Sequence, residues 1–184
     1  MTTIHTIGHS TRTFDELVRL LRRHDVDHLA DVRAHPGSRR YPHFSRSALE
    51  LSLPGVGIGY SHHEALGGRR RGVADSPNGA WRNASFRAYA DYMGTEDFAR
   101  ALDSLIELAQ GSSVAIMCAE AVPWRCHRWL VSDALVTRGV DVYHILDARS
   151  EHHSLTRFAQ VHDGTLVYPP ESAPAEHPDL FDRS

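Results

Sequence analysis

The chain has 184 residues, is 41% hydrophobic and 23% charged, and carries a formal net charge of −3. This length is typical of one domain with a substantial core, and no apolar run approaches the ~20 residues of a membrane-spanning helix, so we expect no membrane partner. All 20 basic residues counted as Lys or Arg are Arg, which excludes chemistry that needs a lysine amine, such as Schiff-base catalysis or a phosphate-loop ATPase.

The first third of the chain is predicted to form a strand–helix–strand unit. Strands are expected at 4–7 and 28–32, and between them a helix at about 14–24 that begins with a capping box of Thr13 and Glu16. Units of this length have parallel strands and a right-handed connection.

The segment at about 34–82 is rich in turns and in arginine. Residues 33–87 hold nine arginines against three acidic residues, although the whole chain is acidic. A short helix at about 46–52 and a strand at about 57–61 fit within it. A basic insertion of this kind is typical of a protein that binds phosphate or nucleic acid, although a solvated loop fits the composition as well.

The remaining pattern again alternates helices and strands. Helices are predicted at 84–93, about 96–109 and about 126–138, and strands at 114–117 and 142–146. A hairpin that pairs 158–161 with 165–168 is expected next, with a helix at 155–160 as the alternative. We therefore predict a three-layer, Rossmann-like α/β domain over 1–168 with a mainly parallel central sheet, followed by a weakly ordered tail at 169–184.

The segment from Val114 to Arg128 carries the candidate catalytic residues Cys118, Glu120 and His127. They follow a buried strand, and ligands of open α/β sheets bind outside the carboxyl ends of the strands. Glu120 lies past the strand end, where a neighbouring Arg33 or Arg128 would keep it ionised as a base or as a polar clamp. A salt bridge that fixes the loop is the alternative.

Both cysteines lie in this segment, and their chemistry stays open. Cys118 resembles the nucleophile of rhodaneses and cysteine phosphatases, but six residues separate it from Arg125, one more than in those loops, and none is glycine. The spacing favours packing over thiolate chemistry at Cys118. We predict no cofactor, although Cys118, Cys126 and His127 could ligate a metal.

Polar residues after the other strands are predicted to bind an anion or the substrate. Asp31 and Arg33 share one face of their strand, where each is the nearest partner for the other. The full predicted set is His9, Ser10, Asp31, Arg33, Ser38, Arg125 and Arg128. We expect His9, Ser10, Arg33, Glu120, His127 and Arg128 to converge on one cleft.

A second group interleaves arginine with aromatic residues, which suits phosphate contacts beside stacked bases. The predicted nucleic-acid contacts are Arg69, Arg70, Arg71, Trp81 and Arg82. The helical spacing of Phe86, Tyr89 and Met93 in the same region is instead typical of a packed core.

Three groups of residues together resemble one protein family. They are Thr6-Ile-Gly-His-Ser10, then Asp31-Val-Arg33 with Pro36 and Ser38, and then Cys118-Ala-Glu120 followed by Cys126-His-Arg128. Their order and spacing are similar to those of domain-of-unknown-function family 488 over roughly 3–168. The resemblance implies a compact bacterial α/β domain and supports a site at Asp31 and Arg33, but it implies no particular activity.

These observations favour an enzyme that acts on a nucleotide or nucleic acid, through hydrolysis or glycosyl cleavage with Glu120 as base. The alternatives are a non-catalytic module that binds nucleic acid or another anion, and thiolate chemistry at Cys118. The expected partner is a phosphate-bearing ligand or nucleic acid. The N-terminus lacks a signal-peptide pattern, and we expect a cytoplasmic protein with unbridged cysteines.

Overall fold

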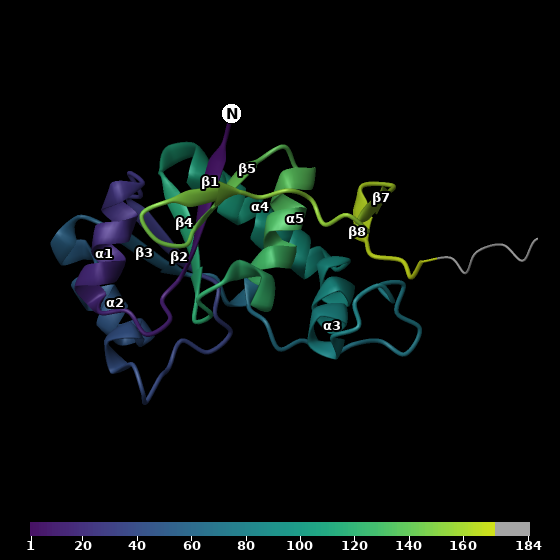
Figure 1. Ribbon diagram of the computed structural model, residues 1–184, viewed down its shortest axis with the longest axis horizontal. Helices are drawn as coiled ribbons and strands as arrows, with labels where there is room; N and C mark the ends of the chain where they lie inside the picture. The colour runs from purple at the N-terminus through teal and green to yellow at the C-terminus, as the bar shows by residue number, and fades with distance from the viewer. Residues whose placement is uncertain (172–184) are drawn as a thin grey trace, which may run out of the picture.

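The computed structural model describes residues 1–171 and contains a central six-stranded sheet (Figure 1). The strand order is β3-β2-β4-β1-β5-β6, and every neighbouring pair is parallel except β5–β6. The strands are β1 (Thr3–Gly8), β2 (His28–Asp31), β3 (Gly59–His62), β4 (Val114–Cys118), β5 (Asp141–Ile145) and β6 (Ser150–His152). A mainly parallel α/β sheet is thus confirmed.

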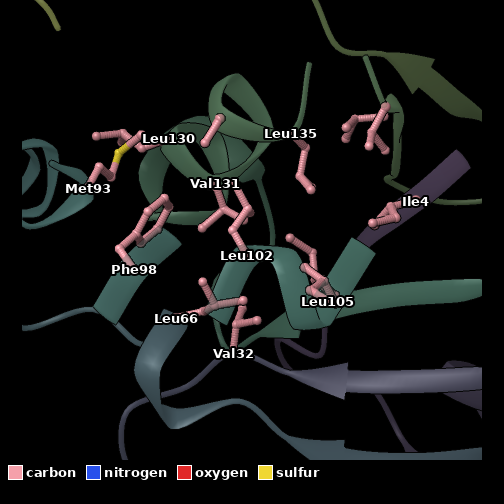
Figure 2. Close-up of a cluster of buried hydrophobic side chains, with 14 of the residues drawn as sticks. Ile4, Val32, Leu66, Met93, Phe98, Leu102, Leu105, Leu130, Val131 and Leu135 are labelled. Carbon is pink, nitrogen blue, oxygen red and sulfur yellow. The ribbon is translucent and has the colours of Figure 1, made fainter. Parts of the chain in front are cut away.

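Helices cover both faces of this sheet and make three layers (Figure 1). One face packs against α1 (Phe14–Arg23) and α2 (Arg46–Ser52), and the other against α3 (Ala84–Met93), α4 (Glu96–Gly111) and α5 (Arg128–Thr137). Figure 2 shows the second interface, where leucines of α4 and α5 meet Ile4 of β1 and Val32 after β2. Strands buried on both faces explain the continuous apolar run in β4.

Local sequence signals set most element boundaries. The predicted capping box opens α1: Thr13 Oγ1 accepts from the Glu16 amide, and the Thr13 amide donates to Glu16. The predicted hairpin is present as β7 (Gln160–His162) and β8 (Thr165–Val167). Asp163 and Gly164 connect them, both with positive φ, as a two-residue hairpin turn requires.

Three expectations need correction. The strand predicted at about 57–61 begins at Gly59, because Gly57 adopts φ 78° and turns the chain. The helix predicted from 126 begins at Arg128, which leaves Cys126 in extended backbone. The exposed antiparallel strand β6 lacks an apolar pattern and was not predicted. Most of the predicted tail at 169–184 lies outside the described residues.

Candidate thiol site at the carboxyl edge of the sheet

The carboxyl ends of β1, β2 and β4 meet at one edge, because both β1 and β2 pair in parallel with β4. These three strand ends are therefore neighbours. Gly8 is aligned with Cys118, and Asp31 with Met117. Gly8 must be glycine here, since a Cβ atom would lie 1.7 Å from the Glu120 carbonyl oxygen. The loop after β4 is therefore packed directly on the end of β1.

A cavity of about 460 Å³ opens at this edge. It combines sulfur, imidazole, guanidinium and aromatic groups from four parts of the chain. The lining includes Arg33, His35, Gly68, Arg69, Ser85, Phe86, Tyr89, Cys118, Glu120, Arg125, Cys126 and His127. Six of the residues predicted for the site thus share one cavity: Arg33, Arg69, Cys118, Glu120, Arg125 and His127.

The two cysteines form a buried pair in this lining. Their Sγ atoms are 2.7 Å apart without a bond between them, and each side chain is at most 5% exposed. Cys118 Sγ accepts from Arg128 Nε at 3.0 Å and from the Glu120 amide at 3.3 Å. Cys126 Sγ accepts from the Arg128 amide at 3.4 Å, in the first turn of α5.

These surroundings favour a pair in which one cysteine is a thiolate and the other is a thiol that donates a hydrogen bond to it. Burial opposes ionisation of Cys126, but the hydrogen bond from Cys118 and the charge and hydrogen bonds of Arg128 lower its pKa to about 6. Burial, and then the hydrogen bond to Cys126, raise the pKa of Cys118 well above its usual value. A helix N-terminus and a nearby arginine are known to stabilise thiolates. Cys126 thereby joins Cys118 as a candidate thiolate, and the alternative of thiolate chemistry at Cys118 stays a prediction.

His127 completes this group with a defined tautomer. Its Nε2 is 2.8 Å from the carbonyl oxygen of Val32 and must donate to it. The neutral ring then presents Nδ1 as an acceptor, 3.7 Å from Cys126 Sγ. Burial lowers the pKa of His127, which keeps the ring neutral. When Cys126 is protonated, its thiol can donate a hydrogen bond to this nitrogen.

Glu120 differs from its prediction. Its side chain is exposed, and among residues 1–171 its carboxylate forms no ion pair. The predicted neighbour Arg128 contacts Glu120 through the backbone, where NH2 donates to the carbonyl oxygen at 2.6 Å. The loop turns this carbonyl inward and leaves the carboxylate at the mouth of the cavity.

The predicted pairing of Asp31 and Arg33 is present and buried. Arg33 donates from Nε to Asp31 Oδ1 at 2.8 Å and from NH2 to Oδ2 at 2.5 Å, and further N–H groups donate to the Phe44 carbonyl and face His9 Nε2. Tyr60 also donates to Asp31, and burial followed by this carboxylate raises the pKa of the Tyr60 hydroxyl. One of the five N–H groups of Arg33 is left for a ligand.

Other residues predicted to bind an anion do not line this cavity. The His9 ring stacks on Phe44 at 4.5 Å, and Ser38 accepts from the Tyr41 amide within a turn. Ser10 follows β1 with φ 48°. Arg128 is buried with its guanidinium among Cys118, Glu120 and β1, so the predicted cleft is formed by only part of the expected set.

The residues predicted to contact nucleic acid have mixed positions. Arg69 lines the cavity with an unusual positive φ of 61°, whereas Arg70 stacks on Tyr92 at 3.8 Å and donates to three backbone carbonyls. Arg71 and Arg82 are exposed. Trp81 packs edge-on against Phe86, Phe158 and Tyr168.

Residues 1–171 contain no cluster of three or more His, Cys, Asp or Glu side chains suited to hold a metal ion. His127 Nε2 is engaged by Val32, while Nδ1 faces Cys126, and metal binding by Cys118, Cys126 and His127 stays a prediction. No helix in the same range is both long enough and apolar enough to cross a membrane.

Sequence reasoning missed the pairing of Cys126 with Cys118 and the lining by Phe86 and Tyr89. The available signal was the position of Cys126 just before a helix, which became clear only when the start of α5 was known. Phe86 and Tyr89 had the helical spacing of core residues, and Tyr89 is indeed buried, with its hydroxyl donating to the Leu66 carbonyl at 2.6 Å.

The fold and the site together define an α/β protein with a buried thiol pair at the carboxyl edge of a mainly parallel sheet. Residues 13–135 match the family model described as "Domain of unknown function DUF488", and the chain belongs to this family. No curated protein and no solved structure matched the chain.

Proposed function

We propose that this protein is a hydrolase that uses the Cys126 thiolate as a nucleophile on a small phosphate-bearing substrate. The observation that carries the proposal is the thiol pair, which receives hydrogen bonds from Arg128 and from the first turn of α5 within an open cavity. Low-pKa thiolates beside positive charge are characteristic of catalytic cysteines.

The walls of the cavity support an anionic substrate. Arg69 and Arg125 are exposed lining residues that form no ion pair within 1–171, and Arg33 has one N–H group left. Guanidinium groups bind phosphate oxygens in a planar, two-point manner. The positive φ of Arg69 is a strained conformation of the kind that clusters at functional sites. Phe86 adds an aromatic surface, which suits a nucleotide.

The expected chemistry has two steps. Cys126 Sγ attacks phosphorus, so that a P–S bond forms while the P–O bond to the leaving group breaks and that oxygen departs with the electron pair and takes a proton from water. A second water then attacks phosphorus, the P–S bond breaks and the thiolate is restored. His127 Nδ1 can accept the proton of this water before passing it to solvent.

A second candidate uses Glu120 as a base in hydrolysis or glycosyl cleavage of a nucleotide or nucleic acid. The carboxylate lines the same cavity, beside the same arginines. A non-catalytic anion-binding module would use those arginines without either nucleophile. These candidates predict different effects of substitutions at Cys126 and Glu120.

The first test is the pH profile of Cys126 labelling by iodoacetamide, followed by peptide mapping. We expect a midpoint near pH 6 and slower labelling in millimolar inorganic phosphate. Arg69→Ala should weaken this protection, whereas Arg71→Ala, an exposed arginine outside the cavity lining, should not. A midpoint near the ordinary ~8.5 of a thiol, or no protection, would overturn the proposal.

Turnover separates the candidates. Hydrolysis of p-nitrophenyl phosphate is expected to be lost in Cys126→Ser and retained in Glu120→Gln. The opposite result would replace the thiolate mechanism with the carboxylate one. Binding of phosphate without turnover by the wild-type protein would favour the non-catalytic module.

A further inference from the structure

Arg128 is buried without a carboxylate partner in the described part of the chain. Only 1% of the residue is exposed. Its guanidinium donates to a cysteine sulfur, a hydroxyl and a backbone carbonyl. Nε donates to Cys118 Sγ at 3.0 Å, NH1 to Thr6 Oγ1 at 3.2 Å and NH2 to the Glu120 carbonyl at 2.6 Å. A buried charge is normally compensated by an opposite one, so the pairing of Arg128 with the thiols requires explanation.

The Thr6 contact begins a chain of buried hydrogen bonds that leads away from the cavity. Thr6 Oγ1 is 2.8 Å from His144 Nδ1, His144 Nε2 is 2.9 Å from His153 Nδ1, and His153 Nε2 is 2.9 Å from Asp133 Oδ1. All four side chains are at most 3% exposed. The chain thus joins β1, β5, the segment after β6, and the middle of α5.

Only one arrangement of protons satisfies every member when both rings are neutral. The Asp133 carboxylate can only accept, so His153 donates to it from Nε2 and accepts at Nδ1 from His144 Nε2. His144 Nδ1 is then left to accept from the Thr6 hydroxyl. Burial, followed by the charges of His153 and Arg128, lowers the pKa of His144 to about 3 and supports a neutral ring.

Asp133 anchors the far end of the chain. Its carboxylate also accepts from the Thr156 amide at 2.9 Å and from the Tyr168 hydroxyl at 2.8 Å. Trp129 stacks on His144 and packs edge-on against His153, with ring centroids 5.4 and 4.5 Å apart. The two rings are thereby fixed in place, and a fully satisfied buried network of this kind specifies a single geometry.

We propose that Thr6, His144, His153 and Asp133 are positioning residues that hold the Arg128 guanidinium against the thiol pair. Asp133 supplies the negative end of the chain, and the neutral groups between it and Arg128 keep that charge too far away to neutralise the guanidinium. The positive charge of Arg128 is therefore directed to the cysteines. This inference rests on the proposed thiolate function and adds to it the residues that maintain the thiolate.

The test compares Thr6→Val with Thr6→Ser in the full-length protein. Valine keeps the shape of threonine but removes both hydrogen bonds, whereas serine retains them. Thr137→Val is the matched control, since this hydroxyl lies at the end of α5 and donates only to the Ala134 carbonyl. The readout is the pH profile of Cys126 labelling by iodoacetamide, together with the melting temperature.

Thr6→Val is expected to slow labelling at pH 6.5 about threefold by moving the midpoint upwards by about one unit. Thr6→Ser should restore the profile, and Thr137→Val should leave it unchanged. If the midpoint of Cys126 labelling is near pH 6 in the wild type and does not change in folded Thr6→Val, the inference is overturned and the proposed function stands. A wild-type midpoint near 8.5 would overturn the proposed function itself.

A measurement on the wild-type protein keeps the inference testable if Thr6→Val does not fold. Nitrogen-15 NMR of the imidazoles should show His144 as the neutral Nε2–H tautomer at pH 5, with an Nδ1 shift that changes as Cys126 ionises. A cationic His144 at pH 5, or a shift that ignores the thiol, would overturn the inference. Arg128 contacts the thiol pair, and the other charged or titratable groups that line its cavity are Arg33, His35, Arg69, Tyr89, Glu120, Arg125 and His127. Those facing His144 are Arg128, His152 and His153.

Discussion

Two buried arginines stand at the same edge of the sheet, and their partners differ. Arg33 is 8% exposed and pairs with Asp31 through two N–H groups. Arg128 is 1% exposed and contacts a thiol, a hydroxyl and a carbonyl. The first charge is neutralised where it lies, so it fixes the loop after β2. The second is not paired with a carboxylate among the described residues and contacts a cysteine, so we propose a chemical role for it.

The largest expected effect is a loss of stability when Arg33 loses its carboxylate partner. Asp31→Ala should lower the free energy of unfolding by about 3–5 kcal/mol, because it leaves Arg33 buried without an opposite charge. Urea denaturation measures this change. Asp97→Ala is the control, since its pair with Arg100 is exposed and should be worth less than ~1 kcal/mol. Equal effects of the two substitutions would contradict the distinction drawn for Arg33.

At Arg128, the expected effect is on the reactivity of Cys126. Arg128→Met should slow labelling of Cys126 at pH 6.5 by at least about tenfold, because the thiolate loses its positive neighbour. Arg12→Met is the control: Arg12 is half-buried and also donates to backbone carbonyls, at Gly8 and Leu146, but it touches neither cysteine. Unchanged labelling in folded Arg128→Met would remove the chemical role of this arginine.

The pH dependence of stability further distinguishes the Arg128 cluster, which includes the thiol pair, from the Arg33 cluster, which includes Asp31 and His9. The Cys126 pKa of about 6 lies below the ordinary ~8.5 of an unfolded thiol, so its stabilisation is complete above pH 8.5 and is lost as the pH falls towards 6. The unfolding free energy should therefore rise between pH 6 and 8.5, by at most ~1.4 kcal/mol per unit, and Cys126→Ser should flatten this rise.

At lower pH, the protonation of histidines determines how the stability changes. Burial lowers the pKa of His9 to about 4, below the ordinary ~6.5, so the unfolded chain binds the extra proton and stability falls as the pH drops from 6.5 towards 4. His9 belongs to the Arg33 cluster, and His9→Gln should reduce the acid slope without changing the slope above pH 6.5. A changed slope in the upper range would show that the clusters are not independent.

The smallest expected effect is at Glu120. Its contact with Arg128 is made by the backbone carbonyl, so Glu120→Gln keeps that contact and should change the rate of Cys126 labelling by less than about twofold. Gly8→Ala is the contrasting change, since its Cβ would displace this carbonyl and disturb the thiol pair. Loss of labelling in Glu120→Gln would show that the carboxylate acts on the thiols.

The sequence predicted the elements well where local signals were strong. The capping box of Thr13 and Glu16, the apolar run of β4 and the Asp163-Gly164 turn each specify a structure within a few residues. The pairing of Asp31 with Arg33 was predictable for the same reason, because the two residues flank one position on a single strand.

The rest depends on contacts between distant segments. The direction of the Arg128 side chain follows from Gly8, 120 residues away along the chain, whose missing side chain makes room for NH2. His144 and His153 meet only because β5 lies beside β1 and β6 folds back on β5. The sequence contains fourteen histidines, and no local pattern indicates which two are buried together.

The bonds of Asp133 also set an order of events during synthesis. Thr6, Arg128 and Asp133 precede in the chain the three partners of the Asp133 carboxylate, which are His153, Thr156 and Tyr168. Because a chain emerges from the ribosome N-terminus first, the thiol pair and its arginine exist before their support does. A nascent chain that stops short of Tyr168 would hold an incompletely bonded carboxylate in α5, so the site reaches its final form only after nearly the whole described chain has been made.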